Sequence, residues 1–269
     1  MTATPRATPS RLVNPHGTAR QGLARTSRRD PWWLVPGIIA TGFGAFIAYS
    51  LFSALVWYPL FGVEYEVDGY LSPFFSPLMF ENVLPVWISP AIFILWIPLG
   101  FRTTCYYYRK AYYRSYFADP PACAVGEPTI HRGYAMERAF PFILQNVHRW
   151  FLYLAFIPLF FLWYDGLISF VNTGQVRIGL GSFVLLANAA LLTGYSLSCH
   201  SLRHLAGGRV DCFSCGVANR VRYRAWQRLT GLNERHMLWA WVSLVSVAMA
   251  DLYVRAIAAG WIVDPAIYL

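Results

Sequence analysis

The densest group of metal-binding side chains lies at residues 199–215, which read CHSLRHLAGGRVDCFSC. On an α-helix, His200 and His204 are about one turn apart and leave the same face. Two glycines follow and can end that helix in a left-handed turn, so that Cys212 and Cys215 can face back toward the imidazoles. Two imidazoles and two thiolates around one point make a complete set of four metal ligands.

Two kinds of metal centre use this set of ligands. A tetrahedral Cys₂His₂ arrangement is a structural zinc site, whereas a Rieske-type [2Fe–2S] cluster takes two cysteines on one iron and two histidines on the other. The spacing of the four residues does not choose between them. Cys199 and His236 are the substitutes if one of the four is not a ligand.

Haem is a third alternative. Its two axial ligands lie on opposite faces of the porphyrin, so His200 and His204 of one helix cannot both bind the same iron. His148 or His236 would have to supply the second ligand.

The elements that must position these ligands are membrane helices. Of the 269 residues, 57% are hydrophobic and 13% are charged, whereas soluble domains carry roughly a quarter charged residues. Five apolar stretches are each near the ~20 residues that cross a bilayer, at 32–58, 83–102, 142–170, 178–204 and 237–259. Pro90 and Pro98 fall in the second and are tolerated where neighbouring helices satisfy the freed carbonyls.

The sequence therefore predicts an all-α integral membrane protein with a bundle of five transmembrane helices over 31–269. Residues 1–30 are polar and rich in arginine, and they are expected to form a disordered or extended basic arm. Five cysteines, an odd number, argue against a disulfide scaffold. Cys105 and Cys123 fall in a loop and are expected to be inert or surface thiols.

Charge predicts the orientation of the bundle. Basic residues are concentrated in 1–30 and in the loops after the second and fourth spans, while the segment after the first span is acidic. With five spans, the three basic segments lie on one side. The positive-inside rule then predicts a cytoplasmic N-terminus and a C-terminus outside, and it explains the net charge of +9 without nucleic acid. His148, His236 and the 199–215 motif all fall near the cytoplasmic boundary.

This pattern resembles the membrane anchor subunit of the mycobacterial (type F) succinate dehydrogenases, which belong to respiratory complex II. The resemblance rests mainly on the 199–215 motif and more weakly on the five spans. It implies that a flavoprotein subunit oxidises succinate and that an iron–sulfur subunit passes the electrons to this anchor, which reduces quinone. It also implies a Rieske-type cluster with Cys212 and Cys215 on one iron and His200 and His204 on the other.

The resemblance further implies a multi-pass protein of the bacterial plasma membrane, with its metal site on the cytoplasmic side. Membrane lipids and the two soluble subunits are the expected partners, and the whole complex could oligomerise. The arginine-rich segment 203–235 and the aromatic, basic run 106–114 are expected to form the docking surface, unless they are ordinary positive-inside loops. Five-span anchors with two b haems need histidines at two membrane depths, which makes haem an unlikely cofactor here.

Quinone is expected near the cytoplasmic ends of the spans. The aromatic and polar residues predicted at that depth are Trp150, Tyr153, Ser201, Arg203, His236 and Trp239. Asp251 and Arg255 lie four apart inside the fifth span, where an internal ion pair is preferred over a proton path or a lipid contact. The alternatives to an electron-transfer anchor are a membrane scaffold with a structural zinc site and a cytochrome b-type haem anchor.

Overall fold

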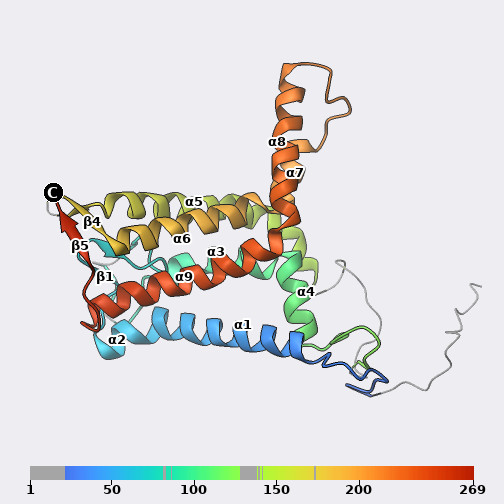
Figure 1. Ribbon diagram of the computed structural model, residues 1–269, viewed down its shortest axis with the longest axis horizontal. Helices are drawn as coiled ribbons and strands as arrows, with labels where there is room; N and C mark the ends of the chain where they lie inside the picture. Colours follow the sequence, from blue (N-terminus) through green and yellow to red (C-terminus); the bar gives the residue numbers. More distant parts are fainter. Residues whose placement is uncertain are drawn as a thin grey trace, which may run out of the picture.

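The computed structural model describes residues 22–80, 83–85, 87–127, 138, 140, 142–172 and 174–269. Within these residues, four helices are long and apolar enough to cross a membrane. The first is α1 (Leu34–Phe52), which continues through a π-helical segment, η1 (Ser53–Trp57), into α2 (Tyr58–Phe61). The others are α5 (His148–Ile168), α6 (Leu180–Leu197) and α9 (His236–Ala258). Figure 1 shows them running side by side in one bundle.

The second predicted span is a shorter helix, α3 (Ile92–Thr103), which begins well after residue 83. Twelve residues rise about 18 Å, less than the ~30 Å of a hydrocarbon core. Prolines at 85 and 90 explain the late start, because proline lacks a backbone N–H and disfavours helix in the residue before it. The expected five full-length helices are therefore four long helices and one short one.

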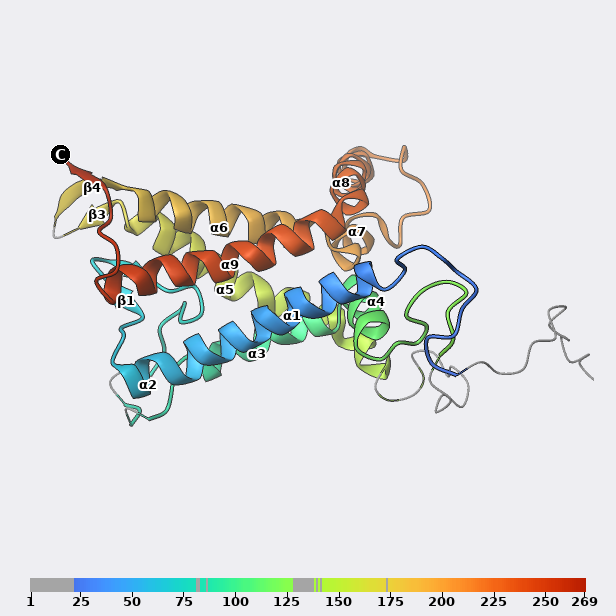
Figure 2. The ribbon, with the colours of Figure 1, turned by 60° about the horizontal axis from the view of Figure 1, so that its bottom comes forward.

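Non-helical chain precedes α3 inside the bundle. Ser72, Phe75 and Ala91, which precede α3, are almost completely buried. Irregular backbone at membrane depth is stable only where protein surrounds it. The bundle supplies that surrounding, and Figure 2 shows this segment entering between the ends of the long helices.

Small residues allow the long helices to approach closely. α6 packs against both α5 and α9. A Cβ built on Gly194 of α6 would lie 2.5 Å from the Trp239 ring of α9, and one built on Gly166 of α5 would lie 2.8 Å from Leu186 of α6. Small residues at helix contacts are the usual means of close packing between membrane helices.

Short strands close the end of the bundle that carries the C-terminus. β1 (Glu66–Val67) and β2 (Tyr70–Leu71) form a hairpin. β4 (Gln175–Gly179) pairs with β3 (Val171–Asn172) on one side and with β5 (Ala266–Tyr268) on the other, both antiparallel. These strands were not predicted, and we call this end of the molecule the sheet end.

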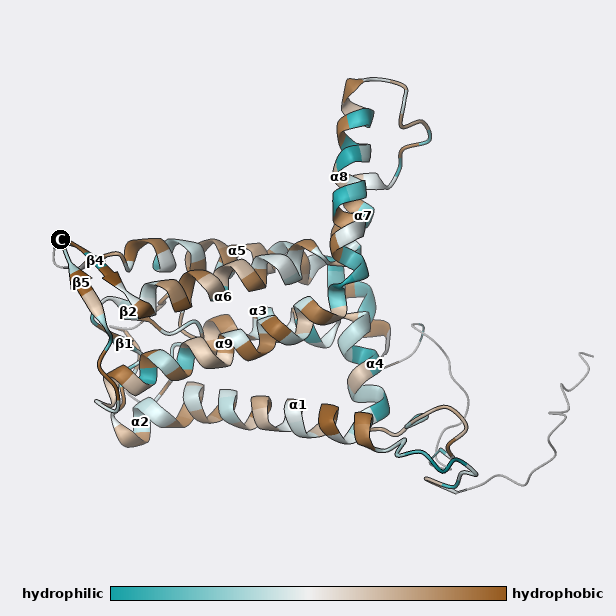
Figure 3. Cartoon of the chain, in the orientation of Figure 1, coloured by the Kyte–Doolittle hydropathy of each residue, from teal (hydrophilic) through white to brown (hydrophobic). Residues whose placement is uncertain are grey.

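The opposite end carries three polar helices. α4 (Tyr106–Ser115) follows α3. α7 (His200–Gly207) and α8 (Val217–Glu234) pack together as an arm that projects sideways from the bundle (Figure 1). Figure 3 shows many hydrophilic residues along α8, whereas the long helices are mostly apolar. The fourth predicted span ends at Leu197 rather than 204, because extended backbone at Cys199 redirects the chain into α7.

The predicted ion pair in α9 is confirmed. Arg255 Nε lies 3.6 Å from Asp251 Oδ1, and both side chains are completely buried. Tyr49 and Ser53 donate hydrogen bonds to Asp251 Oδ2 at 2.6 and 2.5 Å, and Ser72 donates to Oδ1. A buried carboxylate is thereby satisfied by one guanidinium and three hydroxyls.

Candidate metal centre

Four helix starts bring two cysteines and two histidines together inside the polar end of the bundle. Cys105 precedes α4 and Cys199 precedes α7, while His148 and His236 are the first residues of α5 and α9. His148 Nε2 lies 3.2 Å from Cys199 Sγ, and His236 Nε2 lies 3.5 Å from Cys105 Sγ. The two thiols belong to one buried cluster, and we call these four residues the buried quartet.

Two hydroxyl groups fix the orientation of the imidazoles. Thr104 Oγ1 donates its hydrogen to a carbonyl of the preceding helical turn at 2.7 Å and lies 2.9 Å from His148 Nδ1. Ser198 Oγ likewise donates to a carbonyl at 2.9 Å and lies 2.7 Å from His236 Nδ1. Because each hydroxyl has only one hydrogen, each must accept from Nδ1–H.

The tautomers follow from these contacts. A neutral imidazole with its hydrogen on Nδ1 has a free lone pair on Nε2. In both histidines of the quartet Nε2 is the atom that faces a thiol. In metal sites, hydrogen bonds to the other ring nitrogen orient histidine ligands in this way. The quartet therefore presents two sulfurs and two nitrogens with free lone pairs.

Aromatic rings enclose the quartet. The Phe101 ring stacks on His148 with centroids 4.9 Å apart, and the Tyr195 ring stacks on His236 at 5.2 Å. The Arg102 guanidinium lies 4.7 Å from the centre of the Tyr195 ring. Tyr195 is 2% exposed, yet its hydroxyl has no hydrogen-bond partner among the residues that the structure describes. An unpaired buried hydroxyl costs about 1–3 kcal/mol, which makes it a sign of a missing partner.

Burial sets the protonation of the two thiols. It raises the pKa of the Cys105 thiol, and it raises the pKa of Cys199 to about 11. Without a bound metal both groups are therefore thiols at neutral pH and can donate to the facing Nε2 atoms. Metal binding would displace these protons, because the thiolate is the ligand form.

The ligands predicted from the 199–215 motif form two separate pairs. His200 and His204 have their Nε2 atoms 3.0 Å apart on the exposed face of α7. Cys212 and Cys215 form a disulfide in the loop between α7 and α8. Among the described residues, no three His, Cys, Asp or Glu side chains are placed to hold a single metal ion. The predicted set therefore stays a prediction.

The sequence predicts two residues of the buried quartet, Cys199 and His236, as substitute ligands. It predicts that Cys105 is inert and that His148 is a ligand only for haem. The available signal was position: His148 and His236 start predicted spans, and Cys105 follows one, all at the same end. Cys123, by contrast, is an exposed free thiol as expected.

The six residues predicted to meet quinone are spread over different surfaces. Trp150 is 67% exposed and Tyr153 is 42% exposed, so both face outward from α5. Arg203 on α7 donates to Thr230 of α8 at 2.9 Å, and Trp239 packs against Gly194. The remaining two are Ser201, which is half-buried on α7, and His236, which belongs to the buried quartet.

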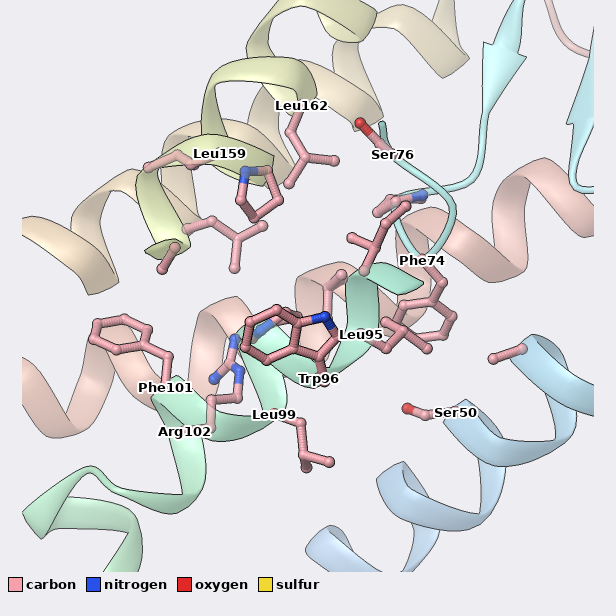
Figure 4. A pocket seen from close by; sticks show the side chains of 18 of the residues that line it. Ser50, Phe74, Ser76, Leu95, Trp96, Leu99, Phe101, Arg102, Leu159 and Leu162 are labelled. Carbon is pink, nitrogen blue, oxygen red and sulfur yellow. The ribbon is translucent and has the colours of Figure 1, made fainter. Parts of the chain in front are cut away.

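An apolar cavity of about 400 Å³ lies between α1, α3, α5, α6 and α9, and none of those six residues lines it. Figure 4 shows apolar side chains such as Leu99, Leu159 and Leu162 around it. Phe101 and Tyr195 line the same cavity and stack on the histidines of the quartet. These two rings therefore lie between the cavity and the histidines of the quartet.

Comparisons with known proteins agree on one family. Residues 34–260 match a family model described as actinobacterial succinate dehydrogenase subunit SdhC. A solved structure, the Mycobacterium smegmatis Sdh1 complex in the apo form, contains a chain that is 39% identical and superimposes with a TM-score of 0.80. The match covers 97% of this chain and 98% of that chain. A search of the curated proteins found no match.

Proposed function

The chain belongs to the family of actinobacterial succinate dehydrogenase subunit SdhC, and we propose that it carries electrons from a docked iron–sulfur subunit through a Rieske-type [2Fe–2S] cluster to quinone. As the membrane subunit of a succinate dehydrogenase complex, it leaves the oxidation of succinate to the flavoprotein subunit. The electrons must then cross from a soluble partner into the membrane, and a redox centre in the anchor would serve that transfer.

The observation that carries the proposal is the buried quartet. A Rieske-type cluster takes two thiolates and two neutral imidazoles, which is the composition of Cys105, Cys199, His148 and His236. A binuclear cluster needs only two protein ligands on each iron, so it does not require three donors around one point. Such a cluster would supply a one-electron carrier of raised potential, since imidazoles replace two negative thiolates.

The quartet is favoured over the ligand set predicted from the 199–215 motif. Its two cysteines are buried, its two histidines are half-buried, and both imidazoles are held by hydroxyl groups. His200 and His204 are exposed, and the two sulfurs of the motif are bonded to each other. Bonded sulfurs cannot act as thiolate ligands until they are reduced.

Iron analysis, EPR and activity of the purified whole complex can distinguish the two ligand sets. The wild-type complex should contain iron and acid-labile sulfide and should give an EPR signal on reduction. His148→Ala with His236→Ala should abolish the signal and succinate–quinone activity, while the matched pair His200→Ala with His204→Ala should retain both. The reverse pattern would assign the cluster to the motif. Stoichiometric zinc without iron, or a Soret band, would refute the electron-transfer proposal in favour of a zinc scaffold or a haem anchor.

Quinone fits the apolar cavity best. Its wall is almost entirely apolar, which suits an isoprenoid chain, and its polar groups include Ser50, Ser76 and Arg102. Ser50 Oγ is buried and has no hydrogen-bond partner within the described part of the chain. Since Phe101 and Tyr195 link the cavity wall to the quartet, a quinone ring at this end would lie close to the proposed electron donor.

Filling the cavity tests this location. Leu162→Trp on α5 should raise the quinone KM by about tenfold or more, because the larger side chain would fill the space of the isoprenoid chain of quinone. Leu167→Trp is the matched control, since Leu167 lies on the same helix but is 59% exposed. Succinate oxidation with a soluble dye should remain normal in both variants. Unchanged quinone kinetics in Leu162→Trp would place quinone elsewhere.

A further inference from the structure

The Tyr195 hydroxyl is a buried polar group beside the quartet whose hydrogen has no assigned acceptor among the described residues. Thr104 and Ser198 give their hydrogens to backbone carbonyls, and the neighbouring Tyr108 hydroxyl donates to the Ala240 carbonyl at 2.6 Å. Tyr195 is as deeply buried as these groups. A phenol in such a place normally has a partner.

Contacts on the Tyr195 ring fix its orientation, so that the hydroxyl lies next to the quartet. One face of the ring stacks on His236 with planes 15° apart, and the Arg102 guanidinium lies over the ring. Arg102 is itself held by Ser243 Oγ at 3.1 Å and by the Ala240 carbonyl. The hydroxyl lies beside the Cys105 sulfur without forming a hydrogen bond of good geometry.

We propose that Tyr195 is a positioning residue whose hydroxyl donates a hydrogen bond to a sulfur of the iron–sulfur centre held by the quartet and thereby raises its reduction potential. This inference rests on the proposed function, because it needs a cluster at the quartet. Reduction adds negative charge to the cluster, and a hydrogen bond to sulfur stabilises the more negative state. Hydrogen bonds to the sulfurs are among the factors that set such potentials.

Tyr195→Phe isolates this effect, because it keeps the stacked ring and removes only the hydroxyl. In a redox titration of the whole complex followed by EPR, the ratio of reduced to oxidised cluster at a fixed potential should fall about tenfold, as expected for one hydrogen bond. For one electron this corresponds to about 59 mV. Tyr108→Phe is the matched control, since its hydrogen is already bound by a carbonyl, and it should leave the ratio unchanged.

A second variant keeps the test decisive if Tyr195→Phe does not assemble. Fluorotyrosine incorporated at position 195 keeps the hydroxyl and makes it a stronger donor, so the ratio should rise instead of fall. A normal EPR signal with an unchanged ratio in these variants would overturn the inference and leave the proposed function intact. Equal shifts in Tyr195→Phe and Tyr108→Phe would also overturn it. Absence of any cluster signal in the wild-type complex would overturn both this inference and the proposed function.

Discussion

At the scale of single residues, two buried hydroxyls orient the histidines of the quartet. Thr104 and Ser198 are almost completely buried, and each uses its hydrogen on the backbone, so each can only accept from an imidazole. This arrangement selects the tautomer that exposes Nε2. In the proposed metal site, the same contacts would orient the histidine ligands.

Ser198→Ala should weaken iron retention about 10–100-fold, because His236 would lose the acceptor that orients it. The measurement is iron per complex after dialysis against a chelator. Ser246→Ala is a suitable control, since its hydroxyl lies on the same helix as His236 but donates to Asn188 at 3.0 Å. Equal iron retention in both variants would show that the hydroxyl of Ser198 does not position a ligand.

The buried ion pair makes a separate prediction about stability. Asp251→Asn should destabilise the subunit by about 3–5 kcal/mol, because it leaves the Arg255 charge buried without its partner. Removing both charges, with Arg255→Met added, should recover part of that loss. Thermal unfolding of the complex in detergent measures both variants. A double variant less stable than Asp251→Asn alone would contradict a structural role for the pair.

At the scale of elements, glycine contacts hold the long helices close enough to place the quartet. Gly194 faces Trp239, three residues after His236. Gly194→Ala should therefore cost about 1–3 kcal/mol by overpacking and should lower cluster content. Gly37→Ala on α1 is the control, since nothing lies within 4 Å of its added Cβ. Iron content and thermal stability report the outcome, and equal values for the two variants would contradict it.

The α7–α8 arm is expected to form part of the docking surface. Arg222 is committed to the arm itself, bonding the Ala206 and Gly208 carbonyls at the end of α7. Arg220, Arg224 and Arg228 are exposed and follow one another at helical spacing. Changing these three to glutamate should weaken assembly with the soluble subunits, with the larger loss at low salt. If the variant still co-purifies fully with the soluble subunits, these three arginines do not form the docking surface.

Sequence patterns predicted the long helices better than the short elements. Apolar runs identify α1, α5, α6 and α9 because length and hydropathy are sufficient for a lipid-facing helix. The strands at the sheet end have two to five residues, too few for a periodic signal. Likewise α3 is short because proline positions, rather than hydropathy, decide where it starts.

The candidate metal site could not be predicted from local sequence spacing. His200, His204, Cys212 and Cys215 are close in sequence, and local spacing therefore favoured them. The quartet comes from four helix starts separated by up to 131 residues between Cys105 and His236. Only the packing of the bundle brings those positions together, and no local pattern contains that information.

At the scale of the whole molecule, the bundle has a polar end with the quartet and a sheet end with the C-terminus. The predicted orientation places the polar end in the cytoplasm. Cys123 tests it, because it is free and exposed while Cys105 and Cys199 are buried. A membrane-impermeant maleimide should label Cys123 in inverted vesicles after removal of the soluble subunits. Labelling only in right-side-out vesicles would reverse the orientation.

The central claim is that the buried quartet holds a two-iron cluster. A density map of the assembled complex tests it most directly. We expect strong density for two irons bridged by sulfides, bound by Cys105, Cys199 and the Nε2 atoms of His148 and His236. Protein-only density there, or metal density among His200, His204, Cys212 and Cys215, would contradict this account.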